Sequence, residues 1–234
     1  MILALETSTT ACSVAIGERD FLISKTDVRP RAHHALLLPM VDELLKQSNT
    51  ALTDLDAIAF GNGPGSFTGL RIAASAAQGL AFGAGLPVIA VSSLQALALT
   101  ALSELQDEAT VTRVLVAVDA HMGDLYWGSF EVINAMPEPE CNDQLCSIDE
   151  FDSQHHDLSA TTLLAGDAWV VYKDRLKTDA TSFAGCVRPS AEAVVRIAET
   201  VDRAQWADPA SVEPRYVRSA SVWKKLDEQK PGRD

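Results

Sequence analysis

The chain reads Phe60-Gly61-Asn62-Gly63-Pro64-Gly65-Ser66-Phe67-Thr68-Gly69-Leu70-Arg71 between an apolar run and a segment rich in alanine and glycine. The preceding run predicts a buried strand, and residues 72–85 predict a helix. A strand, a glycine-rich turn and a helix can direct backbone N–H groups at an anion. The turn lacks the lysine of a Walker A loop, and Ser66 stands where the dinucleotide fingerprint has its third glycine. Composition favours a tight turn over a ligand-binding loop.

The chain has 234 residues, 47% of them apolar, and a formal net charge of −13. This length allows one large domain or two small ones. The negative charge disfavours direct binding of nucleic-acid phosphates, but it permits a role beside a basic partner. No long apolar span occurs, and residues 1–5 predict a first strand rather than a signal peptide. We therefore expect a cytoplasmic protein that does not contact a membrane.

The cysteines and histidines do not predict a metal site. No Cys-x-x-Cys pair occurs, and no cysteine has a histidine at zinc-ligand spacing. The adjacent His33 and His34 cannot share one helix face, so they are assigned to the start of a helix. Free thiols are expected in a reducing compartment at all four cysteines: Cys12, Cys141, Cys146 and Cys186.

The first part of the chain predicts an antiparallel meander of three strands, over residues 2–5, 11–16 and 21–25. Its first hairpin contains Glu6-Thr7-Ser8. The carboxylate and hydroxyls of such a hairpin either hold the phosphates or metal ion of a nucleotide or simply satisfy the turn.

Two helices flank the glycine-rich turn along the chain. In residues 36–46 the helical spacing places Leu37, Met40, Val41, Leu44 and Leu45 on one buried stripe. Pro39 is expected within the first turn, where a missing N–H is tolerated. The additional leucines, Leu36 and Leu38, give this helix surplus apolar surface, which suggests a partner surface. The helix over 69–85 consists mostly of small residues, which allow another helix to approach closely.

Further elements alternate along the chain. Residues 86–91 predict a strand, and Ser92-Ser93 cap a helix that ends near residue 105. This alternation predicts a mixed sheet whose later strands are parallel. Strands are then expected over 114–118 and 125–132, around an acidic turn that begins at Asp119.

The second strand–acidic turn–strand unit suggests an internal duplication, with Asp119 in the place of Glu6. Residues 136–143 are expected to form a surface loop, 163–166 a buried strand, and 191–204 an amphipathic helix. From residue 208 onward the composition predicts an extended tail laid back over the body.

Together, four segments resemble the TsaB (YeaZ) family over nearly the whole chain. They are Glu6-Thr7-Ser8, the turn over 61–71, Asp119-Ala120-His121-Met122-Gly123 and Pro214-x-Tyr216-Val217-Arg218. The resemblance implies an α/β fold of two duplicated actin/Hsp70-like (RNase H-like, ASKHA) lobes, each a mixed sheet flanked by helices. The expected division is a lobe over 1–105, a smaller lobe over 106–206 and a tail over 207–234.

The resemblance also implies a non-catalytic subunit in the synthesis of threonylcarbamoyladenosine at position 37 of tRNAs that read ANN codons. The catalytic paralogue TsaD and the ATPase TsaE are the implied partners, with a homodimer as the alternative assembly and tRNA contacted only indirectly. TsaD has a His-x-x-x-His metal site where this chain has Ser93 and Leu97. No metal and no cofactor are therefore expected.

The residues assigned to the partner surface lie on the two helices described above. They are Leu36, Leu37, Leu38, Met40, Val41, Leu44, Leu45, Arg71, Ala73, Ala74, Ala77 and Leu80. Glu6, Thr7, Ser8 and Asp119 are assigned to a vestigial nucleotide cleft, because actin-like phosphate hairpins use an Asp-x-Gly turn that is absent from both hairpins. We expect weak or no ATP binding.

Two enzymatic alternatives are disfavoured. A metallopeptidase-like or glycoprotease-like hydrolase needs a nucleophile with a base, or a metal-bound water, and Ser66 has no histidine in its motif. A kinase of the ASKHA type would need the nucleotide-binding turns that are altered here.

Overall fold

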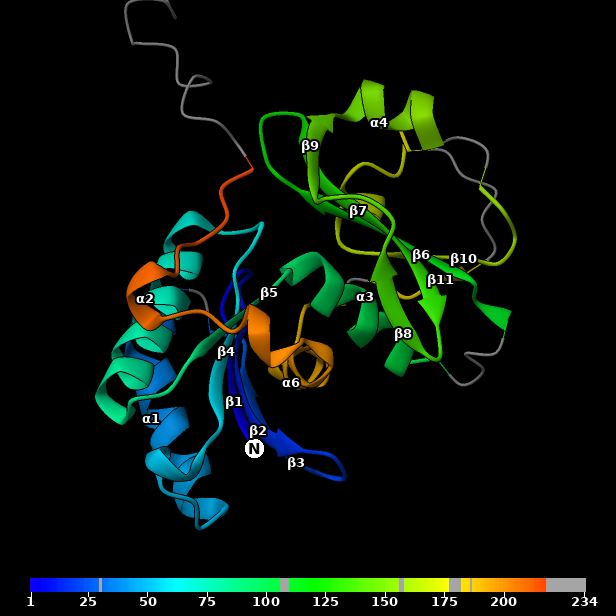
Figure 1. The fold of residues 1–234 in the computed structure, drawn as a ribbon. Helices are drawn as coiled ribbons and strands as arrows, with labels where there is room; N and C mark the ends of the chain where they lie inside the picture. The colour runs from blue at the N-terminus through cyan, green and yellow to red at the C-terminus, as the bar shows by residue number, and fades with distance from the viewer. Residues whose placement is uncertain (30, 106–109, 156–157, 177–181, 186, 218–234) are drawn as a thin grey trace, which may run out of the picture.

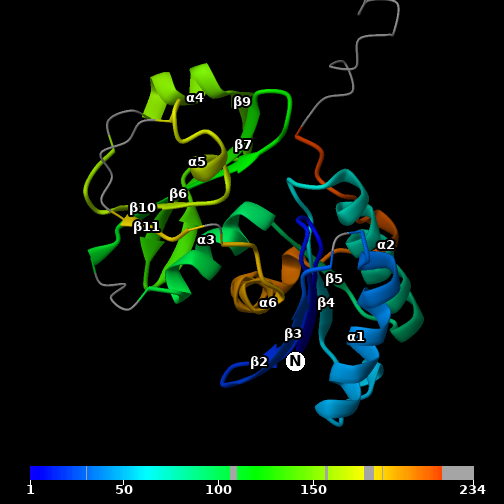
Figure 2. The same ribbon diagram turned by 180° about the vertical axis from the view of Figure 1, so that it is seen from behind.

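The structure is a computed structural model that describes residues 1–29, 31–105, 110–155, 158–176, 182–185 and 187–217. Two mixed sheets, each flanked by helices, lie next to each other (Figures 1 and 2). This confirms the α/β class and the expected pair of mixed-sheet lobes. The helices of the described residues include none that combines the length and apolarity needed to cross a bilayer.

The first sheet has the strand order β3-β2-β1-β4-β5. Its strands are β1 (Ile2–Glu6), β2 (Cys12–Glu18), β3 (Phe21–Asp27), β4 (Ala57–Gly61) and β5 (Val88–Val91). The first three strands are antiparallel, and β4 and β5 continue parallel to β1. The meander and the later parallel strands are thus confirmed.

Helices cover both faces of the first sheet. α1 (His33–Gln47) and α2 (Phe67–Ala84) pack on one face, where Leu3 and Leu5 contribute to the core. α6 (Ala191–Thr200) packs on the other face against Ile2 and Ala4. Strand side chains alternate between the faces, so a strand covered on both sides is apolar throughout.

Two helix boundaries differ from the expected ones. α1 begins at His33, so Pro39 lies in the second turn and not in the first. In an α-helix the carbonyl of Ala35 would accept a hydrogen bond from the N–H of residue 39. Pro39 has no N–H, so this helical hydrogen bond is missing. α2 begins at Phe67 and not near residue 72, because the Ser66 side chain accepts the Gly69 N–H at 3.3 Å and caps the helix.

The second sheet repeats the first. Its order is β11-β10-β6-β7-β8, with β9 also paired to β7, and β6 is antiparallel to β7 and parallel to β10, as β1 is to β2 and β4. The strands are β6 (Arg113–Asp119), β7 (Asp124–Ile133), β8 (Met136–Pro139), β9 (Gln144–Ser147), β10 (Thr162–Ala165) and β11 (Ser182–Phe183). This matching topology confirms the internal duplication.

The expectation of a loop over 136–143 is wrong for β8. Asn134 and Ala135 have φ values of 53° and 62°, as in the two-residue turn of a β-hairpin. This turn brings β8 alongside β7. β8 is a sheet edge, where prolines are tolerated because one side of the strand needs no N–H.

α3 (Ser93–Ser103) lies between the two sheets. Leu94, Leu97 and Leu102 share a core with strand residues of the second sheet, whereas Ala96 and Leu99 belong to the core under α6. The helix thus joins both lobes, and the expected division of the chain at 105 and 206 stays a prediction. Two shorter helices, α4 (Ile148–His155) and α5 (Ala168–Val171), complete the second lobe.

The described part of the tail returns to the first lobe. Ala207 forms an antiparallel bridge with Val88, and Val212 is buried in the core under α1 and α2. Residues 218–234, which include Arg218 of the tail motif, lie outside the described residues, as does Cys186. The described cysteines, Cys12, Cys141 and Cys146, have free thiols.

Two glycines of α2 provide a matched test of the packing. A Cβ on Gly69 would lie 1.9 Å from the backbone oxygen of Thr7, whereas a Cβ on Gly79 would have nothing within 4 Å. Gly69→Ala should destabilise the chain by about 1–3 kcal/mol, because backbone must move. Gly79→Ala should stabilise it by about 0.5–1 kcal/mol.

Urea unfolding measures both effects. Equal midpoints for the two variants would contradict the close contact between Gly69 and Thr7.

Candidate functional site

The glycine loop, residues 61–69, lies directly on the first hairpin. The Ser66 N–H donates to the Ser8 carbonyl at 2.7 Å, and the Thr7 hydroxyl donates to the Gly69 carbonyl at 2.8 Å. A Cβ on Gly65 would lie 2.5 Å from the Ser8 oxygen. The loop therefore needs its glycines to approach its own chain closely, which supports the tight-turn interpretation over a ligand-binding loop.

Glu6 lies beneath this loop and is only 1% exposed. Its carboxylate accepts the Ser8 N–H at 2.5 Å and the Ser93 hydroxyl at 2.9 Å. The Ser93 oxygen in turn accepts the Gly63 N–H at 3.2 Å. A Cβ on Gly61 would meet the Glu6 carboxylate at 1.7 Å. One network thus joins the hairpin, the loop and the start of α3.

Burial raises the pKa of Glu6, and the hydrogen bonds from Ser8 and Ser93 offset this only in part. No ion pair to Glu6 is found within the described ranges. A buried carboxyl with no cation favours its neutral form. This environment is buried and already hydrogen-bonded within the chain, unlike the open turn that binds a phosphate.

Ser93 and Leu97 occupy the two positions that the family resemblance pairs with metal-binding imidazoles. Ser93 is buried and bonded to Glu6, and Leu97 is buried in the core between α3 and the second sheet. Neither side chain fits a metal site: the Ser93 hydroxyl is hydrogen-bonded to a carboxyl, and the Leu97 side chain is aliphatic. The residues that the structure describes contain no cluster of three potential His, Cys, Asp or Glu ligands.

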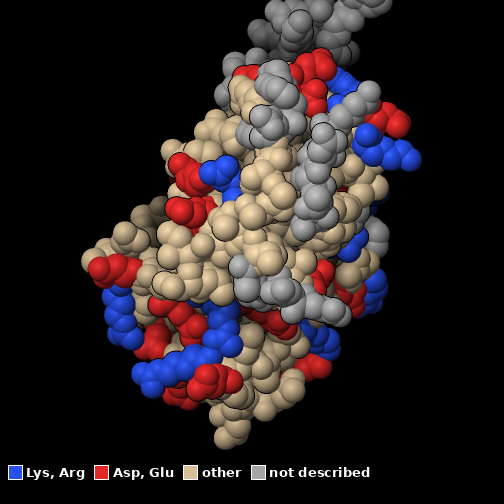
Figure 3. Space-filling view, turned by 90° about the vertical axis from the view of Figure 1, so that its right-hand side faces the viewer, with Lys and Arg blue, Asp and Glu red and all other residues tan. Residues whose placement is uncertain are grey.

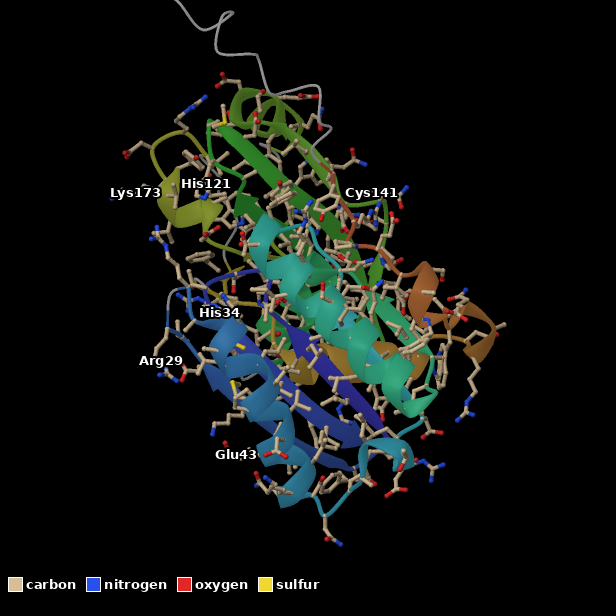
Figure 4. The ribbon with its side chains drawn as sticks, turned by 90° about the vertical axis from the view of Figure 1, so that its left-hand side faces the viewer. Arg29, His34, Glu43, His121, Cys141 and Lys173 are labelled. Atoms are coloured by element: carbon tan, nitrogen blue, oxygen red, sulfur yellow. The ribbon has the colours of Figure 1, made fainter. Side chains whose placement is uncertain are left out.

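Asp119 ends β6 as Glu6 ends β1, but it has different partners. Its carboxylate accepts the Tyr172 hydroxyl at 2.7 Å and the His121 N–H at 2.8 Å. The hydrogen bond to Asp119 raises the pKa of Tyr172. Figure 4 shows His121 on the second lobe and His34 at the start of α1, well separated. The structure groups Glu6, Thr7 and Ser8, whereas Asp119 makes its contacts within the second lobe.

The residues assigned to the partner surface divide into two groups. Those that are buried pack against the first sheet in the free chain: Leu37, Met40, Val41, Leu44, Ala73, Ala74 and Ala77. Those that retain exposed surface are Leu36, Leu38, Leu45, Arg71 and Leu80. The burial of Leu37, Met40, Val41 and Leu44 confirms the stripe that helical spacing predicts. In the free chain, the residues of the first group contribute to its own core, and their role in a partner surface stays a prediction.

Arg71 belongs to a row of exposed residues along α2, the α2 row, whose other members the sequence reasoning missed. Its members follow one another at every fourth position, a spacing that could have revealed them: Phe67, Arg71, Ser75, Gly79 and Gly83. Side chains built on Gly79 or Gly83 would enter open space. Phe82 lies next to the row and is 81% exposed.

Known proteins resemble this chain along its whole length. The family profile described as TsaD, tRNA N6-adenosine threonylcarbamoyltransferase, matches residues 26–222. The tRNA threonylcarbamoyladenosine biosynthesis protein TsaB of Escherichia coli (strain K12) is 35% identical, covering 100% of this chain and 99% of its own. TsaB of Haemophilus influenzae is also 35% identical, covering 100% and 98%. The solved structure of YeaZ from Pseudomonas aeruginosa has a TM-score of 0.82 and 35% identity, over 92% of this chain and 98% of that one.

Glu6 generates a prediction about stability and pH. Its pKa in the folded chain is raised above the ordinary value of 4.5, so the folded state keeps the proton between the two values. The contribution of Glu6 to the free energy of unfolding is fully present below the pKa of Glu6 in the unfolded chain. It is lost as pH rises through the pKa of Glu6 in the folded chain. The slope is at most about 1.4 kcal/mol per pH unit.

Glu6→Gln cannot lose this proton, so its free energy of unfolding should fall less over the same window. Urea unfolding at a series of pH values measures the difference. Glu138→Gln, on an exposed residue of β8, is the control. Parallel pH profiles for Glu6→Gln and the parent chain would contradict the prediction.

Proposed function

The chain belongs to the TsaB (YeaZ) family of tRNA threonylcarbamoyladenosine biosynthesis proteins, and from this we propose that it is a non-catalytic subunit. It binds and activates a TsaD-family enzyme, which transfers the threonylcarbamoyl group to adenosine 37 of tRNAs that read ANN codons. The ATPase TsaE is the third component. The chain acts in the cytoplasm.

The observation that carries this proposal is the environment of Ser93. Ser93 donates a hydrogen bond to the Glu6 carboxylate and accepts one from the Gly63 N–H. Leu97, one turn later, is buried in the core. The two positions that the resemblance pairs with the paralogue's metal ligands are thus occupied by a structural hydroxyl and a core side chain. The glycine loop likewise fills the first hairpin, where a nucleotide-binding kinase would need an open turn.

The α2 row supports docking of the partner on this helix. Glycine in a helix interior costs about 1 kcal/mol relative to alanine. Gly79 and Gly83 bring no compensating contact inside the chain, since a Cβ there would meet nothing within 4 Å. Small residues on a helix surface permit close approach by a second helix. Leu38, which is 52% exposed on the neighbouring α1, extends the apolar surface.

The partner surface proposed here therefore consists of the α2 row with Leu38 and Phe82. In the absence of the enzyme, the same surface would pair two copies of the chain, because the two proteins share a fold. tRNA is reached through the complex and not by this chain alone. The net charge is −13, and the face shown in Figure 3 intersperses acidic and basic side chains without a continuous basic area.

Gly79→Leu and Leu38→Glu test this surface. Each should weaken binding to the purified TsaD-family enzyme of the same organism by about tenfold or more, because a side chain blocks close approach or a charge is buried. Gly79→Leu should leave the free chain at least as stable as the parent, since leucine favours helix and meets no neighbour. Titration calorimetry measures the affinity.

Ile133→Glu is the matched control, because Ile133 is 45% exposed at the end of β7 in the second lobe. Ala77 is unsuitable for a charge, since it is fully buried and the variant would test folding. If Gly79→Leu and Leu38→Glu both bind like Ile133→Glu, the partner does not dock on this surface.

A further inference from the structure

The tail segment 212–216, here called the strap, is held by the loops and helix of the first lobe. The Gln78 side chain donates to the Val212 carbonyl at 2.8 Å. The Arg215 N–H donates to the carbonyl of Asn62, in the glycine loop, at 2.8 Å. A Cβ on Gly63 would lie 3.0 Å from the Arg215 oxygen. Figures 1 and 2 show this segment running from α2 toward the second lobe.

The side chain of Arg215 contacts the second lobe. Its Nη1 lies 3.4 Å from Oδ2 of Asp143, in the connection between β8 and β9. The Asp143 side chain is only 4% exposed and also accepts the Ser92 hydroxyl at 3.1 Å. Burial raises the pKa of Asp143, and Ser92 and Arg215 partly offset this. Removing a cation that is paired with a buried carboxylate is strongly unfavourable.

The next residue of the strap contacts the partner surface proposed above. The Arg71 Nε donates to the Tyr216 hydroxyl at 3.0 Å. The rings of Phe67 and Tyr216 are 5.4 Å apart between centroids, and the Arg71 guanidinium lies 3.9 Å from the centre of the Phe67 ring. Phe67 and Arg71 are the first two members of the α2 row. Adjacent strap residues therefore contact the second lobe and the α2 row.

We propose that the strap couples the α2 row to the second lobe, so that a partner on α2 tightens the segment around Asp143 through Tyr216 and Arg215. This inference rests on the proposed function, because it takes the TsaD-family enzyme as the occupant of the row. The contacts form a continuous chain from Phe67 to Asp143. Arg215 is the positioning residue of this coupling. Coupling is reciprocal, so loosening Asp143 must also weaken the partner.

Hydrogen exchange of the backbone amides of residues 140–147 tests the coupling in the full chain. The TsaD-family enzyme should slow their exchange by about fivefold or more in the parent chain. Arg215→Met should lose most of this protection, whereas Arg215→Lys, which keeps the charge, should retain part of it. Arg203→Met is the matched control, because Arg203 is an exposed arginine paired with Asp56 away from the strap.

Adding Asp143→Asn to Arg215→Met removes the unpaired buried charge and keeps the chain folded if the single variant unfolds. The double variant should still lack the protection, because the contact itself is gone. Partner binding without slower exchange at 140–147, or full protection in Arg215→Met, overturns the coupling alone. A chain that does not bind the enzyme overturns the coupling and the proposed function together.

Discussion

The close contact between the glycine loop and the first hairpin sets the arrangement of the first lobe. Gly65 and Gly69 lie against the backbone of Ser8 and Thr7 at distances that exclude a Cβ. Hydrogen bonds from Ser66 and Thr7 then fix the loop. Because α2 begins within this loop, the contact determines where the helix lies over the sheet and which of its faces remains exposed. The contact between the glycine loop and the first hairpin thus also leaves the α2 row exposed on the surface.

The duplication shows how one topology accommodates two different hairpins. Both sheets place a carboxylate at the end of the central strand, Glu6 in β1 and Asp119 in β6. Glu6 is sealed under the glycine loop and bonded to Ser93, whereas Asp119 accepts a hydrogen bond from Tyr172. A buried carboxyl is tolerated only when its polar atoms have partners. In the first lobe these partners come from the hairpin itself and from the start of α3, so the network joins the hairpin, the glycine loop and α3 instead of leaving an open turn.

Local patterns in the sequence predicted most of the architecture. Apolar runs and helical spacing located β1, β4, β5 and α1, and the repeated strand–turn–strand unit indicated the duplication. The errors have physical causes. The proline-containing segment 136–139 resembles a loop in sequence, because the pairing of β8 depends on a left-handed turn at Asn134 and Ala135. The small residues of α2 could not be divided into buried and exposed sets, because alanine and glycine are compatible with either. The pairing of Arg215 with Asp143 joins residues that are distant in sequence, so no local pattern predicts it.

We propose that this chain keeps the architecture of an enzyme and acts through its catalytic relative. Reconstitution of tRNA modification from purified TsaD-family enzyme, TsaE, this chain, the threonylcarbamoyl adenylate and tRNA tests it most directly, with each protein omitted in turn. Modified adenosine 37 should fall to the background level when this chain is omitted, and the chain alone should yield none. Modification at the full rate without the chain, or modification by the chain alone, would contradict it.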